Sequence, residues 1–158
     1  MATIINTSKL QLDEVLTWLE QEQNDSCEGF YCNKEIIIDS FNACEMRCIK
    51  LNGLTVGFGI FNIKSISASI DILEIHPSYR GNGLGMQMAQ HLLAHLFNSR
   101  VPYVSVKCTP KSSEKFWRKL GFIEYPDKYR HLREPLELKL TAERHNYSFK
   151  PPPLRGAI

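Results

Sequence analysis

The pattern of apolar and polar positions alternates along the chain between helical and strand spacing. A short apolar run at Ala2–Asn6 predicts a strand. Ser8, with Gln11 three residues later, forms a capping box, which predicts that a helix begins there. The apolar positions of this helix recur at helical spacing: Leu12, Val15, Leu16 and Leu19. Its glutamates are expected to face solvent: Glu14, Glu20 and Glu22.

The segment from Asn24 to Ala43 gives a weaker pattern, in which Gly29, Phe30 and Tyr31 stand in polar surroundings. We favour a second short helix with a connection. The alternative is a lid that carries aromatic residues over an acceptor site.

Two strand patterns follow, at residues 45–51 and 54–61, and Asn52-Gly53 joins them. Asn-Gly between two alternating runs strongly favours a two-residue hairpin. In the second strand Gly57 and Gly59 leave one face without side chains. This indicates either close packing of a helix or room for a ligand.

The next strand changes phase. Its apolar side chains occupy even positions from Ile66 to Ile72, then odd positions at Leu73 and Ile75. Because side chains alternate between faces, the slip predicts a β-bulge near Ile72-Leu73. A bulge leaves backbone groups unpaired, so an extended ligand with amides of its own could pair with them.

The same bulge is expected to bring Asp71 and Glu74 to one face of the sheet. Two close carboxylates raise each other's pKa, and one of them could then act as general base for an ammonium substrate. Two solvated strand carboxylates are the alternative.

A glycine-rich loop follows this strand. Pro77 ends the strand, and the run Arg80-Gly81-Asn82-Gly83-Leu84-Gly85-Met86 opens directly into a helical pattern. The bare N–H groups of such a turn, together with the helix dipole, favour phosphate binding. Two common phosphate loops do not fit, because Met86 stands where G-x-G-x-x-G needs its last glycine and no Gly-Lys-Ser/Thr ending is present.

The helix after the loop is expected to run to about Asn98, and a strand at residues 103–108 should lie parallel to the bulged one. Thr109 then caps a helix with Pro110 at its first position. This helix should end at Gly121, with Phe122 folding back on Trp117. Residues 125–133 look like a loop, and residues 135–140 alternate as a last strand.

The loop, preceded by Ile75-His76-Pro77, resembles the acyl-CoA loop of the GNAT N-acetyltransferase superfamily. The run Phe116-Trp117-Arg118-Lys119-Leu120-Gly121-Phe122 resembles the second signature of that family, and together the resemblance covers roughly residues 47–122. It implies a GNAT-type α/β (α+β) fold, with a mixed, mostly antiparallel sheet whose splayed parallel pair is flanked by helices.

The resemblance also implies direct transfer of an acetyl group from acetyl-CoA to a primary amine of a small molecule or protein. It places acetyl-CoA as co-substrate on a set of loop, strand and helix residues: Leu73, Ile75, Arg80, Gly81, Asn82, Gly83, Leu84, Gly85, Met86, Ser112 and Phe116. Glu74 and Asp71 are the expected catalytic residues. The alternative is a non-catalytic acyl-CoA-binding or interaction module on the same scaffold.

Two residues depart from the family pattern. Trp117 stands where a tyrosine often protonates the departing thiolate, and an indole N–H is no useful acid. Pro110 stands where the family often has an asparagine. Because a thiol is a tolerable leaving group, catalysis need not depend on that tyrosine. Cys108, Tyr125, Tyr129 or water could supply the proton.

Composition adds the remaining expectations. We expect a single domain at residues 1–141 and an extended, Pro-rich, basic tail at residues 142–158. The five cysteines are expected to be reduced and to bind no metal. A net charge of +2 argues against a nucleic-acid partner. We expect a cytoplasmic protein with no membrane partner, because neither a signal peptide nor a long apolar run is present, and a homodimer is compatible with the resemblance.

Overall fold

A seven-stranded sheet forms the centre of the molecule in the computed structural model, which describes residues 1–124 and 135–149. The strand order is β1-β2-β3-β4-β5-β7-β6. Neighbouring strands are antiparallel except for β4 and β5, which pair in parallel. The strands are β1 (Ala2–Asn6), β2 (Met46–Leu51), β3 (Leu54–Ile63), β4 (Ala68–Ile75), β5 (Tyr103–Lys107), β6 (Ile123–Glu124) and β7 (Glu137–Thr141). The predicted fold class is confirmed, although the sequence pattern missed β6.

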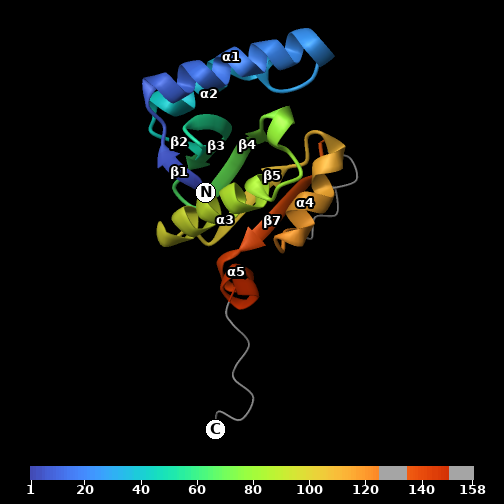
Figure 1. Cartoon of the computed structure of the whole chain (residues 1–158). Helices are drawn as coiled ribbons and strands as arrows, with labels where there is room; N and C mark the ends of the chain where they lie inside the picture. Colours follow the sequence, from blue (N-terminus) through green and yellow to red (C-terminus); the bar gives the residue numbers. More distant parts are fainter. Residues whose placement is uncertain (125–134, 150–158) are drawn as a thin grey trace.

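Helices cover both faces of this sheet (Figure 1). On one face lie α1 (Lys9–Ser26) and α2 (Lys34–Asn42), and on the other lie α3 (Leu84–Asn98) and α4 (Glu114–Lys119). Short 3-10 turns occur at Tyr31–Asn33, Pro77–Tyr79 and Lys111–Ser113. The core therefore has two apolar layers, one on each side of the sheet. The helix favoured for residues 24–43 is confirmed as α2.

The hairpin and the two strand glycines serve packing. Asn52 and Gly53 both have positive φ, at 51° and 80°, as the predicted two-residue turn requires. A Cβ on Gly59 would lie 2.6 Å from Leu92 Cδ1 of α3, and one on Gly57 would lie 2.5 Å from Ile75 Cδ1. Of the two readings of these glycines, close packing is therefore the one that the geometry supports.

The bulge in β4 lies one residue before the predicted position. Ile60 pairs with Ile72 but Phe61 pairs with Ile70, so Asp71 is the extra residue. The apolar pattern shows only the point after which the side chains have changed faces. The backbone pairing with β3 determines which residue of β4 has no partner. Beyond the bulge, Ile72 packs with the α1 and α2 layer and Ile75 with the α3 and α4 layer.

Two predictions at element ends are wrong. The helix expected to begin at Pro110 starts as the 3-10 turn Lys111–Ser113, and α-helical geometry begins at Glu114. The tail expected to be extended from Ala142 instead begins with α5 (Ala142–Phe149), because Thr141 Oγ1 accepts a hydrogen bond from Arg144 N–H at 3.2 Å. The predicted loop at 125–133 and the tail at 150–158 lie outside the described residues.

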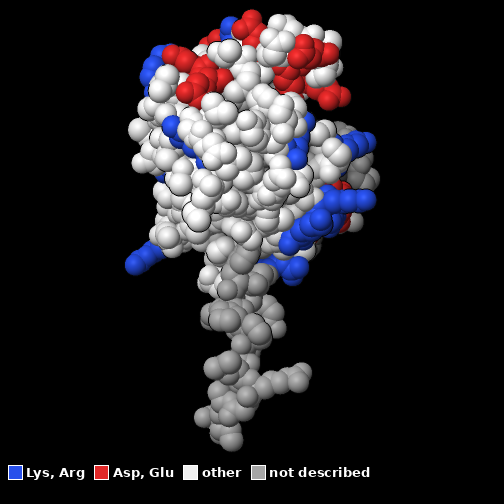
Figure 2. Space-filling model, viewed as in Figure 1, with Lys and Arg blue, Asp and Glu red and all other residues white. Residues whose placement is uncertain are grey.

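Charge divides unevenly between the two layers. Residues 1–45 carry nine acidic and two basic side chains, whereas residues 111–119 carry four basic and one acidic. In Figure 2 the acidic side chains gather over α1 and α2, and Lys and Arg gather where α4 lies. The α1 and α2 side of the molecule therefore attracts cations and the α4 side attracts anions.

Candidate active site

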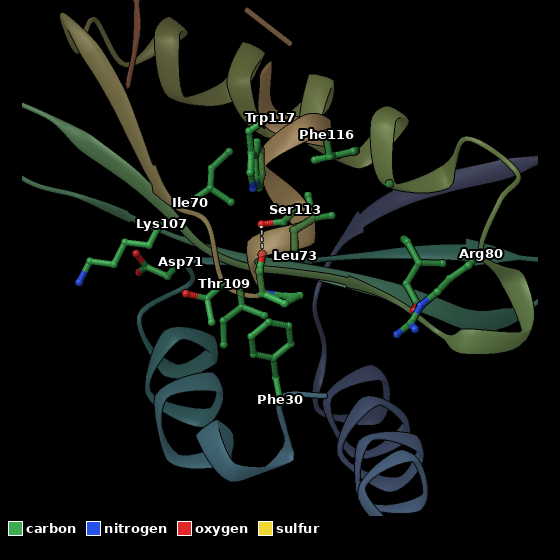
Figure 3. Close-up of a pocket in the computed structure, with 14 residues that line it drawn as sticks. Phe30, Ile70, Asp71, Leu73, Arg80, Lys107, Thr109, Ser113, Phe116 and Trp117 are labelled. Carbon is green, nitrogen blue, oxygen red and sulfur yellow. Dashed lines mark hydrogen bonds between the residues drawn. The ribbon is translucent and has the colours of Figure 1, made fainter. Parts of the chain in front are cut away.

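The gap between β4 and β5 holds a cavity of about 340 Å³. The two strands pair only from Ala68 with Val104 to Ile70 with Val106, so β4 continues without β5 beside it after the bulge. Phe116 and Trp117 of α4 line the cavity on one side, and Phe30 lines it on the other (Figure 3). The lining is mainly apolar and suits an extended, partly apolar ligand.

The backbone of β4 faces this gap at Leu73 and Ile75. His76 N–H donates to Val56 O of β3 at 2.7 Å, and antiparallel strands alternate the edge to which successive residues turn their N–H and C=O groups. Leu73 and Ile75 therefore turn theirs to the open side. Ile75 O already accepts a hydrogen bond from Arg80 Nε at 2.8 Å, which leaves the Ile75 N–H and both groups of Leu73 for a ligand.

The glycine loop forms the end of the gap. Gly81 and Gly83 have φ of +83° and +78°, and a Cβ on either would meet no atom within 4 Å. The N–H groups of residues 84–86 precede the helical hydrogen bond from Gln87 N–H to Gly83 O, so they have no carbonyl one turn back. Open space beside unpaired N–H groups at a helix N-terminus fits the pyrophosphate of an acyl-CoA.

Two other predicted contacts lie around the same gap. Gly85 lines the first cavity, and a Cβ there would make an ordinary contact of 3.7 Å with Phe116 Cε2. Ser112 is exposed and lines a second cavity, while Ser113 lines the first.

The second cavity, of about 530 Å³, adjoins the first and is acidic. The two cavities share part of their walls and are therefore adjacent: Phe30, Leu73, Arg80, Thr109 and Pro110 line both. The second cavity adds the carboxyl groups of three glutamates: Glu22, Glu28 and Glu74.

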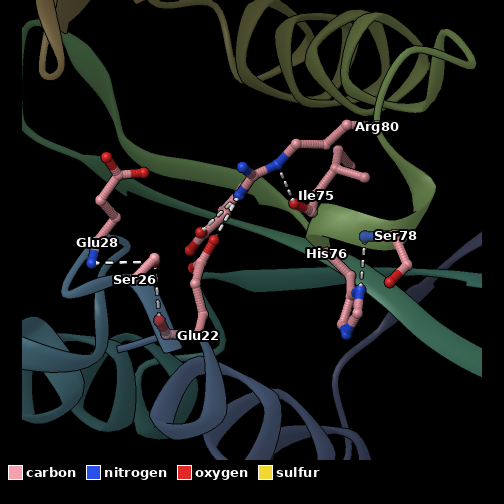
Figure 4. A network of polar contacts seen from close by, with 8 residues as sticks. Glu22, Ser26, Glu28, Ile75, His76, Ser78 and Arg80 are labelled. Atoms are coloured by element: carbon pink, nitrogen blue, oxygen red, sulfur yellow. Dashed lines mark hydrogen bonds and ion pairs between the residues drawn. The ribbon is translucent and has the colours of Figure 1, made fainter. Parts of the chain in front are cut away.

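The guanidinium of Arg80 holds two buried carboxyl groups, those of Glu22 and Glu74. Figure 4 shows Arg80 beside Glu22 and the Ile75 carbonyl. Arg80 Nη2 lies 2.8 Å from Glu22 Oε2 and 3.1 Å from Glu74 Oε1. The carboxyl side chains are only 6% and 5% exposed, and the arginine is half-exposed. Glu22 Oε1 and Glu74 Oε2 are buried without a hydrogen-bond partner among the described residues.

This environment shifts the pKa of Glu74 to about 9. Burial is the largest cause, and the hydrogen bond and negative charge of Glu22 raise the pKa further, while Arg80 and the Phe30 backbone lower it. The pair therefore holds a proton at neutral pH. A cation that enters the cavity would favour release of that proton.

The sequence interpretation of Glu22 is wrong, because this residue faces the sheet instead of solvent. Its position continues the helical spacing of Leu12, Val15 and Leu19, which is the signal that could have found it. Gly29 closes over the pair, since a Cβ there would overlap Glu22 Oε1 and lie 3.3 Å from Glu74 Oε1.

Asp71 does not take part in this pair. It is exposed at the bulge, where its Oδ1 accepts a hydrogen bond from Ser69 Oγ at 2.7 Å, and it lines the first cavity. The carboxyl group that raises the pKa of Glu74 belongs to Glu22.

Neither Trp117, at the position of the family's tyrosine, nor Cys108 is placed to act as an acid. Trp117 is buried and packs edge-on against Phe116 and Phe122, with ring centroids 4.9 and 5.4 Å apart. Cys108 is buried, and burial raises the pKa of its thiol, but it does not line either cavity. Tyr125 and Tyr129 lie outside the described residues.

Within residues 1–124 and 135–149, no group of three or more His, Cys, Asp or Glu side chains is placed to hold a metal ion. The helices of that same part of the chain include none that is long and apolar enough to cross a membrane.

Comparison with known proteins places this geometry in a family context. A sequence profile described as the acetyltransferase (GNAT) family matches residues 11–122. The search of curated proteins found no match.

Several solved structures share the fold. N-acetylglutamate synthase from Neisseria gonorrhoeae, complexed with coenzyme A and N-acetyl-glutamate, superposes with a TM-score of 0.69 at 13% identity, over 90% of this chain and 35% of that chain. The chain therefore spans about a third of that synthase. The PaiA N-acetyltransferase from Thermoplasma acidophilum, in complex with coenzyme A, superposes with a TM-score of 0.70 at 11% identity, over 89% of this chain and 99% of that chain. A GNAT family acetyltransferase from Brucella melitensis, in complex with acetyl-CoA, superposes with a TM-score of 0.68 at 14% identity, over 96% of this chain and 90% of that chain.

Proposed function

The chain belongs to the acetyltransferase (GNAT) family, and from this premise we propose that it transfers an acetyl group directly from acetyl-CoA to a primary amine. The observation that carries the proposal is that two adjacent cavities share Leu73 and Phe30 in their walls. One cavity suits the pantetheine arm, and the other is acidic and suits an ammonium group.

The residues that would hold acetyl-CoA come from the unpaired edge of β4, from the glycine loop and from α4. Backbone groups of Leu73 and Ile75 would pair with the amides of the pantetheine arm, and the N–H groups of residues 81–86 would hold the pyrophosphate. Phe116 and Trp117 would cover the apolar part of the arm. Acetyl-CoA supplies an acetyl thioester, whose carbonyl a strand N–H can polarise.

The Glu22–Glu74 pair would then act on the acceptor. An acceptor that arrives as an ammonium ion loses two protons in the reaction. One passes to the carboxyl pair and on to solvent, and the other ends on the CoA thiol when the C–N bond has formed and the C–S bond has broken. Holding the amine beside the thioester supplies much of the rate through proximity.

Calorimetric titration of acetyl-CoA tests the binding part of this proposal. Gly83→Asp would place a carboxylate in the phosphate space and should abolish binding. Gly53→Asp is a matched control, because Gly53 has a similar φ of +80° and equally open surroundings, in the distant β2–β3 hairpin. Micromolar binding that is kept in the control and lost in Gly83→Asp supports the proposal, and equal binding by both variants would contradict it.

A non-catalytic acyl-CoA-binding module is the second candidate. It is favoured by Trp117, which offers no useful acid, and by the proton that Glu74 holds at neutral pH. Under this reading acetyl-CoA binds as above, and no amine releases the thiol at any pH from 7 to about 9.5.

A further inference from the structure

We propose that the acceptor is a small linear aliphatic amine with a second cationic group, held across the acidic cavity by the Glu22–Glu74 pair at one end and by Glu28 at the other. This inference rests on the proposed function and assigns its substrate class.

The inner end of the cavity has an excess of carboxyl oxygens. Arg80 contacts one oxygen of Glu22 and one of Glu74, while the second oxygen of each carboxyl group is buried without a partner among the described residues. Buried polar atoms are normally hydrogen-bonded. The proton that the pair holds at neutral pH supplies one donor, and when a bound cation makes the pair release it, a donor from the ligand is needed in its place. An ammonium group supplies three N–H donors and a positive charge in a small volume.

The carboxylate at the outer end of the cavity is exposed, unlike the buried pair. Glu28 lines the same cavity, but it is exposed, in the segment between α1 and α2. An exposed carboxylate can hold the second cation of a ligand while that cation stays in contact with water. Once a bound cation has made the pair release its proton, three carboxylates and one guanidinium line the cavity, so a single ammonium group would not balance their charge.

Apolar side chains make up another part of the wall. Phe30, Leu73 and Pro110 line the cavity together with the three glutamates, and methylene groups pack well against such surfaces. A short alkyl chain with a cation at each end matches a cavity that combines carboxyl groups with apolar side chains.

The electrostatic field around the cavity also favours an acceptor with two cationic groups. The acidic side chains of residues 1–45 gather over α1 and α2, the helices between which Glu28 lies (Figure 2). Such a field raises the local concentration of cations and disfavours acceptors with a carboxylate, such as free amino acids.

The test compares kcat/KM for 1,4-diaminobutane and for butylamine, which share a chain length and differ in one amine. We expect the diamine to be favoured at least tenfold at low salt. Glu28→Gln should reduce the ratio of the two kcat/KM values about fivefold, since one partly exposed charge pair is lost. Glu20→Gln on α1 is the matched control, because Glu20 is exposed and does not line the cavity, and it should leave the ratio unchanged.

Equal kcat/KM values for the two amines would overturn this inference and leave the proposed function standing. A better rate with a lysine-containing peptide than with the diamine would overturn it as well. Acetylation of no amine, with acetyl-CoA binding intact, would overturn the proposed function and this inference together.

Discussion

Glu22 Oε2 of α1 lies 2.8 Å from Arg80 Nη2 at the start of the glycine loop, although 58 residues separate them in the chain. Arg80 also contacts Glu74 and the Ile75 carbonyl of β4. One side chain thus joins the phosphate-binding loop, the splayed strand and the helix that covers the acidic cavity. Arg80 lowers the pKa of Glu74, which Glu22 and burial raise, so these contacts set the protonation of the expected base.

Glu22→Gln should shift the pH dependence of acetyl transfer to lower pH. The amide keeps the shape of the side chain and removes the negative charge that raises the pKa of Glu74. We expect kcat of the wild type to rise with pH toward a midpoint near 9, and the midpoint of the variant to lie about one unit lower. An unchanged midpoint, with Glu20→Gln as control, would show that this pair does not set the rate.

Glu74→Gln should make stability less sensitive to pH. The pKa of this carboxyl is 4.5 in a model compound and about 9 in the fold, so the folded state binds the extra proton between these values. The stabilisation is therefore complete below about pH 4.5 and is lost as the pH rises through about 9. We expect urea unfolding to show a smaller fall in the free energy of unfolding from pH 5.5 to pH 8.5 in the variant than in the wild type.

The histidines cancel in that comparison, since both proteins carry the same five. If the two proteins lose the same free energy of unfolding over this pH range, Glu74 does not hold its proton in the fold.

Gly29→Ala should destabilise the fold and disrupt the carboxyl pair. Gly29 has a φ of +92°, and its Cβ would overlap Glu22 Oε1. Gly53→Ala has a similar φ of +80° but open space around the new methyl group. We expect a loss of about 1–2 kcal/mol in Gly53→Ala from the left-handed backbone alone, and a clearly larger loss in Gly29→Ala. Urea unfolding measures both, and equal losses would mean that Glu22 moves aside without cost.

The loop, the hairpin and the packing stripe of α3 could be predicted because their signals are local. Asn52-Gly53 favours one turn type, and the apolar positions of α3 recur at helical spacing and are all buried: Leu84, Met88, Ala89, Leu92, Leu93 and Leu96. The gap between β4 and β5 was also expected, because the phase slip in β4 and the resemblance point to the same place. These features need no knowledge of distant contacts.

The carboxyl pair could not be predicted in the same way. Polar residues on an amphipathic helix usually face solvent, and the glutamate on the buried stripe of this helix is stabilised by Arg80, which lies far along the chain. The start of α5 was missed for a local reason, because the prolines after it suggested an extended tail and outweighed the capping signal of Thr141.

The most direct test of the proposed acetyl transfer is mass spectrometry of the protein incubated with acetyl-CoA and 1,4-diaminobutane, together with a thiol assay. We predict that mono-acetylated diamine and free CoA thiol form in equal amounts, that both are lost in Gly83→Asp, and that both are kept in Gly53→Asp. Thiol release without acetylated amine, or tight acetyl-CoA binding with neither product up to about pH 9.5, would contradict the account.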